Sequence, residues 1–142
     1  MIIKQLSVFL ENKTGRLNEV TQLLGNAGIN MSAFSVADTS EFGILRVIVT
    51  EPEKALLILK EADFSARLTD VVCLNSPNEP GALARALNIL ATENVVIEYL
   101  YAYSMDETSA NIVLKPDNIE KCIEVFHAHQ IDLVKASDMY KI

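Results

Sequence analysis

Basic residues are scarce in this sequence. It contains 12 Lys and Arg against 19 Asp and Glu, which gives a formal net charge of −7 at pH 7. Proteins that bind nucleic acid neutralise its phosphates with Lys and Arg, so this balance argues against a nucleic-acid partner. Half of the residues are hydrophobic and under a quarter are charged. This composition predicts one packed domain or two small ones rather than a disordered chain.

Cysteine is also rare. Cys73 and Cys122 lie in apolar surroundings, without a CxxC pair and without the Cys/His spacing of a metal site. We therefore expect two buried free thiols, no metal ion, no cofactor and a reducing, cytoplasmic environment. Residues 1–5 do not read as a signal peptide, and no apolar run is long enough to span a membrane, so no membrane partner is expected.

Patterns of catalytic residues are missing as well. His127 and His129 are the only histidines, and two residues spaced by two cannot share a helix face as i, i+4 ligands do. No Ser-His-Asp or Cys-His arrangement stands out. We expect a protein that is not an enzyme, with both histidines on its surface.

The hydropathy pattern alternates between the period of a strand and the period of a helix. Gly28 ends the first predicted helix, a turn is expected at residues 41–43, and Pro52 opens the second helix. The order is β-α-β-β-α-β. The predicted strands are residues 2–10, 30–38, 44–49 and 66–76, and the predicted helices are residues 17–27 and a segment from Pro52 onward.

This order occurs twice. Placing Gly81 on Gly15 gives an offset of 66 (81 − 15), and this offset also sets Asn94 on Gly28. We predict that the offset falls to 65 in the third strand and becomes 67 in the second helix. Further predicted pairs are Phe34 with Leu100, Val47 with Ile112 and Glu53 with Glu120. The chain is thus predicted to be an internal duplication, with one domain at 1–69 and a second at 70–142.

The two copies meet without a spacer. Residues 66–76 must supply the last strand of one copy and the first strand of the next, and no Gly- or Ser-rich linker separates them. We expect one long or kinked strand near Leu68 to Leu74, and two halves that pack as one rigid body.

Both copies carry a glycine turn between the first strand and the first helix, at residues 12–17 and 78–83. Glycine accepts positive φ and lets a ligand approach the backbone closely. The helix that follows directs free N–H groups and the positive end of its dipole at the turn, which suits a carboxylate. Asn12 and Asn78 are candidate helix caps. The alternative interpretation is that both are ordinary strand-to-helix turns.

The sequence resembles the ACT domain family twice over. The resemblance covers nearly the whole chain and rests on the Asn-x-Pro-Gly-x-Leu turn, intact at Asn78 to Leu83 and with Thr14 for Pro in the first copy. It rests also on Gly28-Ile29-Asn30 at the start of the second strand, where the second copy departs with Asn94-Val95-Val96. ACT domains are ferredoxin-like modules, so the resemblance implies an α+β fold of two ferredoxin-like βαββαβ domains in tandem.

The resemblance also implies a function. ACT domains commonly bind a free amino acid at the junction of two copies and regulate amino-acid metabolism. Two copies fill the chain, and we expect no attached enzyme domain. The expected partners are a free amino acid, a second copy of the chain and a metabolic enzyme or regulator. The expected ligand-binding residues are Asn12, Thr14, Gly15, Arg16, Leu17, Asn30 and Met31, with Asn78, Pro80, Gly81, Ala82 and Leu83.

Three tyrosines give an alternative function. Tyr99, Tyr101 and Tyr103 alternate along the second strand of the second copy, and we expect them on the face of the sheet without helices. Tyr provides contact area with a polar tip and is common at interfaces. The stripe is therefore a candidate dimer surface, or the docking face of a ligand-free assembly module.

Overall fold

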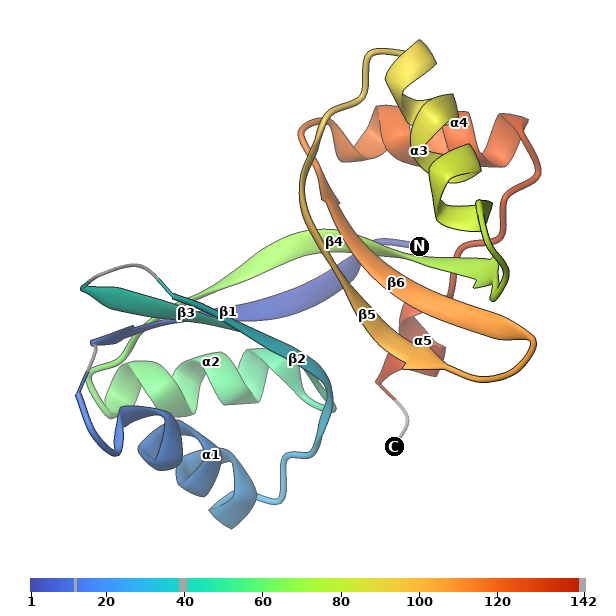
Figure 1. Cartoon of the computed structure of the whole chain (residues 1–142). Coiled ribbons are helices and arrows are strands. Elements are labelled where there is room, and N and C mark those ends of the chain that lie inside the picture. The colour runs from blue at the N-terminus through green and yellow to red at the C-terminus, as the bar shows by residue number, and fades with distance from the viewer. Residues whose placement is uncertain (12, 39–40, 141–142) are drawn as a thin grey trace. The chain divides into compact units, whose positions relative to one another are not determined.

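The computed structural model describes residues 1–11, 13–38 and 41–140 (Figure 1). The predicted order of strands and helices is confirmed in the first copy, and in the second copy up to its second helix, after which an isolated bridge takes the place of the last strand. The strands are β1 (Ile3–Glu11), β2 (Met31–Asp38), β3 (Phe42–Val49), β4 (Ser65–Pro77), β5 (Ile97–Met105) and β6 (Ser109–Pro116). The helices are α1 (Arg16–Asn26), α2 (Pro52–Glu61), α3 (Ala82–Thr92), α4 (Ile119–Ala128) and the short α5 (Ala136–Met139).

The chain forms two compact units that exchange their ends. The first unit consists of Lys4–Thr69 and the C-terminal segment from Met139, and the second unit consists of Asp70–Asp138 and Met1–Ile3. β4 is one continuous strand of 13 residues, as the missing spacer predicted. The expectation that the two halves form one rigid body stays a prediction.

In the first unit, α1 and α2 cover one face of a sheet with the order β2-β3-β1-β4 (Figure 1). Leu6 pairs with Val47 and Val8 with Leu45 in the antiparallel register. These residues face the helices, because strand neighbours share a face. The core that results is formed by Leu6, Val8, Leu10, Val20, Leu24, Ile29, Leu45, Val47, Val49, Ala55, Leu59 and Phe64.

In the second unit, α3 and α4 cover one face of a sheet with the order β4-β6-β5 (Figure 1). A short bridge between Leu74 and Leu133 stands where the first unit has a full fourth strand. It is held by Asn75 N–H, which donates to the Asp132 carbonyl at 2.9 Å, and by a hydrogen bond from Val134 N–H to the Cys73 carbonyl at 2.8 Å.

The sheet register corrects the predicted alignment of the copies. Val47 pairs with Leu6 in the first unit, and Leu114 pairs with Val72 in the second, so Val47 corresponds to Leu114. The offset in β3 is therefore 67 (114 − 47), not 65, and α2 and α4 keep the same value (119 − 52). The single added residue is Tyr103, which lies at a β-bulge where the register shifts between Ala102 and Ser104.

The ends of the helices confirm the equivalence of the units. Gly28 and Asn94, matched at an offset of 66, have φ values of 73° and 60°. Asp63 and Gln130, matched at 67, have φ values of 64° and 56°. Each helix thus ends in a left-handed residue at the same place in both copies.

The turn predicted at residues 41–43 is wrong. β3 already begins at Phe42, because Phe42 pairs with Glu11 and Gly43 pairs with Leu10. Pairing with β1 thus extends the strand over residues that the sequence marks as a turn.

The buried thiols are confirmed. Cys73 and Cys122 are free and have no solvent exposure. Desolvation raises the pKa of Cys73 to about 12. Desolvation, together with the negative charge of Asp117, raises the pKa of Cys122 to about 11. Neither thiol is therefore a nucleophile at neutral pH.

Candidate functional site

The first glycine turn has the backbone geometry that its sequence predicts. Gly15 is the N-cap of α1, with φ 87° and ψ −4°, and no side chain caps the helix. The Glu19 N–H donates to the Gly15 carbonyl at 2.9 Å and closes the first helical bond. The N–H groups of the first turn have no acceptor within the helix. A Cβ on Gly15 would meet nothing within 4 Å, so the space in front of the turn is open.

Arg16, the first residue of α1, is turned back onto the first unit. Its guanidinium carbon lies 4.3 Å from the centroid of the Phe64 ring, a cation–π distance. Its Nη1 donates to Glu19 Oε2 at 3.0 Å, and its side chain is only 25% exposed. The Nε atom is buried without a hydrogen-bond partner. Arg16 therefore covers Phe64 and is held there by Glu19.

A pocket of about 220 Å³ lies beside this turn. Glu11 and Lys13 form an ion pair of 2.9 Å at its rim, and the hydrogen bond and charge of Lys13 lower the pKa of Glu11. Leu17, one of the expected ligand-binding residues, is 43% exposed and lines the pocket. The lining residues are Leu10, Glu11, Lys13, Arg16, Leu17, Val36 and Gly43.

The second glycine turn repeats the first. Gly81 is the N-cap of α3, with φ 87° and ψ −8°, and the Arg85 N–H donates to its carbonyl at 2.9 Å. Arg85 stands at the position of Glu19 in the first unit (85 − 66), so the charge at this position is reversed. Its Nη2 donates to Glu79 Oε1 at 2.7 Å. Its Nη1 lies 3.3 Å from where a Cβ on Gly81 would be. A guanidinium therefore lies over this turn.

Asn78 does not cap α3, so that prediction is wrong. Its side-chain amide donates to the Asp106 carbonyl, and its N–H donates to the Thr108 carbonyl at 3.1 Å. The turn is thereby joined to the β5–β6 hairpin. The Asp106 carboxylate accepts the N–H groups of Thr108 and Ser109 at 2.8 and 2.7 Å. These bonds lower the pKa of Asp106. The other predicted cap, Asn12, lies outside the described residues.

Two of the remaining predicted residues, Asn30 and Met31, lie apart from the first turn within the first unit. Asn30 immediately precedes β2, where its N–H donates to Thr50 Oγ1 and its side chain accepts the Met31 N–H. Met31 pairs with Val49, whereas Gly43 pairs with Leu10 next to the turn. Six residues of β3 separate these positions, about 20 Å. Thr14 is exposed beside Gly15, and Pro80, Ala82 and Leu83 surround Gly81.

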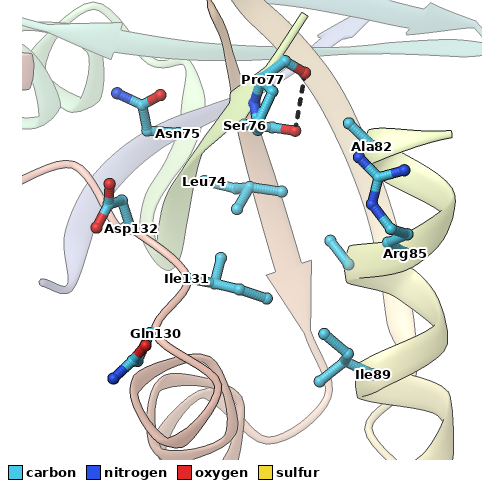
Figure 2. A pocket seen from close by; sticks show the side chains of 11 residues that line it. Leu74, Asn75, Ser76, Pro77, Ala82, Arg85, Ile89, Gln130, Ile131 and Asp132 are labelled. Atoms are coloured by element: carbon cyan, nitrogen blue, oxygen red, sulfur yellow. Dashed lines mark hydrogen bonds between the residues drawn. The ribbon is translucent and has the colours of Figure 1, made fainter. Parts of the chain in front are cut away.

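A larger pocket, of about 370 Å³, lies within the second unit beside α3 (Figure 2). We call it the α3 pocket. It is lined by Leu74, Asn75, Ser76, Pro77, Ala82, Arg85, Ala86, Ile89, Gln130, Ile131 and Asp132. Figure 2 shows Arg85 on α3 at one side and Asp132 on the opposite side. Apart from Ala82, the sequence predicted none of these residues as ligand-binding.

The tyrosine stripe is less regular and less accessible than predicted. Tyr101 pairs with Val113 and Leu100 with Leu114, and Leu114 belongs to the core under the helices. The register therefore sets Tyr101 on the helix-free face. However, Tyr101 is only 9% exposed, and Tyr103 lies at the bulge. Larger apolar exposure occurs on edge strand β2, where Phe34 is 61% exposed.

Other kinds of site find little support in the described part of the chain. Between residues 1 and 140, apart from positions 12, 39 and 40, no group of three His, Cys, Asp or Glu residues could hold a metal ion. His127 and His129 are exposed, as predicted. None of the described helices is both long and apolar enough to cross a membrane.

Comparison with known proteins identifies the fold. A family model described as the ACT domain pair matches residues 1–142. The chain belongs to this family. It is 50% identical to a protein from Bacteroides thetaiotaomicron of known crystal structure, over 100% of this chain and 98% of that one, with a TM-score of 0.94. No curated protein sequence gives a significant match.

Two structures named as aspartate kinase regulatory subunits share this ACT fold. The subunit from Thermus thermophilus, in its ligand-free form, has a TM-score of 0.64 at 16% identity and covers 89% of this chain and 93% of its own. The subunit from Thermus flavus has a TM-score of 0.62 at 17% identity, with 90% and 92% covered. The predicted tandem ferredoxin-like fold is confirmed. The ACT domain pair is a regulatory module, typical of proteins that sense amino acids.

Proposed function

We propose that this ACT domain pair is a regulatory protein of amino-acid metabolism that binds a free amino acid reversibly and has no catalytic activity of its own. The observation that carries the proposal is the pair of glycine N-caps, Gly15 and Gly81, with the same φ of 87° in two equivalent turns. Each begins an 11-residue helix that no side chain caps. The first N–H of each helix donates to a turn carbonyl, of Lys13 or Glu79, and the next N–H groups, which have no acceptor within the helix, are the ones proposed to meet a ligand carboxylate.

In this proposal the ligand lies at an interface of ACT domains, which comprise residues 1–69 and 70–142. Its carboxylate meets the turn at Thr14 to Leu17 or at Pro80 to Leu83, and its ammonium meets carbonyls or an Asn side chain such as Asn30. Arg16 and Arg85 lie at the two turns, and each is paired with a glutamate, Glu19 at 3.0 Å and Glu79 at 2.7 Å. Binding of a carboxylate at either turn therefore depends mainly on the backbone N–H groups. The protein acts in the cytoplasm as a homodimer, and ligand binding alters its association with a metabolic enzyme or regulator.

The ligand-free assembly module is the weaker candidate. It depends on the tyrosine face, and Tyr101 is already buried within a single chain. We therefore place the dimer contact at edge strand β2, whose exposed Phe34 and Val36 resemble the apolar core of an interface.

A thermal-shift screen of the full chain against the twenty amino acids tests the proposal. A specific ligand at 100 times its Kd adds about 2.7 kcal/mol of stability. Calorimetry then compares the wild type with Gly15→Val, Gly81→Val and the double variant, which place a side chain in the turns. We expect each single variant to lose one site and the double variant to lose both. Undiminished binding by a folded double variant would show that the turns are merely structural.

A further inference from the structure

The duplication allows the α3 pocket to be compared with the same place in the first unit. α1 and α3 correspond at an offset of 66, and the segments after α2 and α4 correspond at 67. Most of the lining positions carry different residues in the two units, and four of them change how the space between the start of the first helix and the segment after the second helix is filled. In the first unit they are Arg16, Glu19, Val20 and Phe64, and in the second they are Ala82, Arg85, Ala86 and Ile131.

In the first unit, side chains fill this place. Phe64 is 5% exposed and belongs to the core. The guanidinium of Arg16 lies over its ring at 4.3 Å, and Glu19 fixes the guanidinium at 3.0 Å. An aromatic ring and a cationic side chain thus occupy the space between the start of α1 and the segment that follows α2.

In the second unit, the same place is open. Ala82 has no guanidinium, Ala86 is smaller than Val20, and Ile131 has no ring. The pocket that remains is about 370 Å³, within the range of small-molecule sites. Figure 2 shows Leu74, Ile89 and Ile131 directed into it, so its walls are mainly apolar.

The charge at the pocket is also reversed. Arg85 replaces Glu19, and its 2.7 Å bond to Glu79 holds it at the edge of the pocket next to the Gly81 turn. Ser76, which is 4% exposed, adds a buried hydroxyl to the same side of the lining. A guanidinium recognises a carboxylate through two parallel hydrogen bonds. An apolar cavity with a guanidinium at its edge fits a ligand that has an apolar body and one carboxylate.

We propose that the α3 pocket binds a small hydrophobic carboxylate, of the size of a branched-chain or aromatic amino acid. Its apolar body lies on Leu74, Ile89 and Ile131, in the volume that Phe64 and Arg16 fill in the first unit, and its carboxylate pairs with Arg85. This site goes beyond the proposed function, because it lies within one unit and needs no second ACT domain.

The test closes the pocket with the residues of the first unit. The variant Ala82→Arg/Arg85→Glu/Ile131→Phe rebuilds an arrangement that the same fold already accommodates. Calorimetry on the full chain uses four probes: L-leucine, L-phenylalanine, 4-methyl-2-oxopentanoate and phenylpyruvate. We expect the α3 pocket to contribute one site per chain in the wild type, counted apart from the sites at the glycine turns. Its Kd should be at least about tenfold weaker in the closed variant, a loss of at least about 1.4 kcal/mol.

Two further variants separate the contribution of the Arg85 guanidinium from that of the open cavity. Arg85→Gln weakens carboxylate binding about tenfold, by the same conversion, and leaves the affinity for L-leucinol, which lacks the carboxylate, unchanged. Arg16→Ala/Phe64→Ile opens the first unit and adds a second, weaker site. Binding of the 2-oxo acids as well as the amino acids identifies the carboxylate as the recognised group. Binding of the amino acids alone adds a requirement for the ammonium, and both results support the pocket.

The result that overturns the proposal is equal affinity in the wild type and in a folded closed variant. If the Gly15→Val/Gly81→Val variant then removes the binding, the turns are the amino-acid site and the proposed function stands without the α3 pocket. Failure of all four probes to bind the wild type at millimolar concentration also overturns the proposal. If the triple variant does not fold, Ile131→Phe alone is measured and judged by the same criterion.

Discussion

The left-handed glycine turns predict the stability of matched Gly→Ala variants. Gly15 has φ 87° and open space where a methyl group would lie, whereas Gly25, in the last turn of α1, has open space and no positive φ. The left-handed conformation costs a residue with a Cβ about 1–2 kcal/mol. Replacing a helical glycine with Ala gains up to about 1 kcal/mol. We therefore expect Gly15→Ala to be less stable than Gly25→Ala by about 2 kcal/mol.

Gly81→Ala should behave like Gly15→Ala, because its backbone is the same and the atom near its Cβ is the flexible end of Arg85. The two costs should add, since Gly15 and Gly81 belong to different units. Urea unfolding monitored by circular dichroism measures the differences, with an unchanged m value as the check on the denatured state. If Gly15→Ala is as stable as Gly25→Ala, the turn is not left-handed in solution, and the N-cap argument for the ligand site is wrong.

Other predictions concern the C-terminal segment, the dimer, acid stability and the thiols. Met139→Ala should destabilise the protein by about 2–5 kcal/mol in urea, because Met139 is fully buried, whereas the exposed Met105→Ala is the near-neutral control. Phe34→Ser/Val36→Ser should shift sedimentation from dimer to monomer more than Tyr99→Ser/Tyr101→Ser does, and a persistent dimer counts against the β2 contact. The pKa of Asp106 is lowered in the folded state, so its ionised carboxylate stabilises the fold at pH values above the usual aspartate pKa. This stabilisation is lost as the pH falls through the pKa of the folded state, so Asp106→Ala should weaken the pH dependence of stability in acid. With pKa values of about 12 and 11, Cys73 and Cys122 should react with a thiol reagent at pH 8 only after denaturation, and fast labelling of the native protein contradicts their burial.

The fold could be predicted because hydropathy period reports secondary structure directly, and a duplicated order of elements narrows the topology. The alignment of β3 with its counterpart β6 could not be predicted from the sequence. Offsets of 65 and 67 differ by two residues. Because side chains alternate between the faces of a strand, a shift of two residues keeps every side chain on the same face, and the hydropathy pattern still matches. Only the pairing of Val47 with Leu6 and of Leu114 with Val72 decides between them.

The candidate site was predicted in part. Glycine at positions 15 and 81 indicates positive φ, because few other residues accept it. Asn78 was misassigned because its partner, Asp106, is 28 residues away in a hairpin. The α3 pocket leaves only an indirect signal in the sequence, since it results from side chains that are small. Aligning Phe64 with Ile131 and Arg16 with Ala82 would have revealed it.

The exchange of chain ends has a consequence for how the protein is made. The first unit includes the buried Met139, and its Lys4 N–H donates to the hydroxyl of Tyr140 in the C-terminal segment at 2.8 Å. Met139 follows Thr69 by 70 residues (139 − 69). At a synthesis rate of about 5–20 residues per second, it leaves the ribosome roughly 4–14 s after the rest of that unit. The N-terminal half can therefore form the core between its sheet and helices before this segment is made, but it reaches its final packing only after translation of the C-terminal segment.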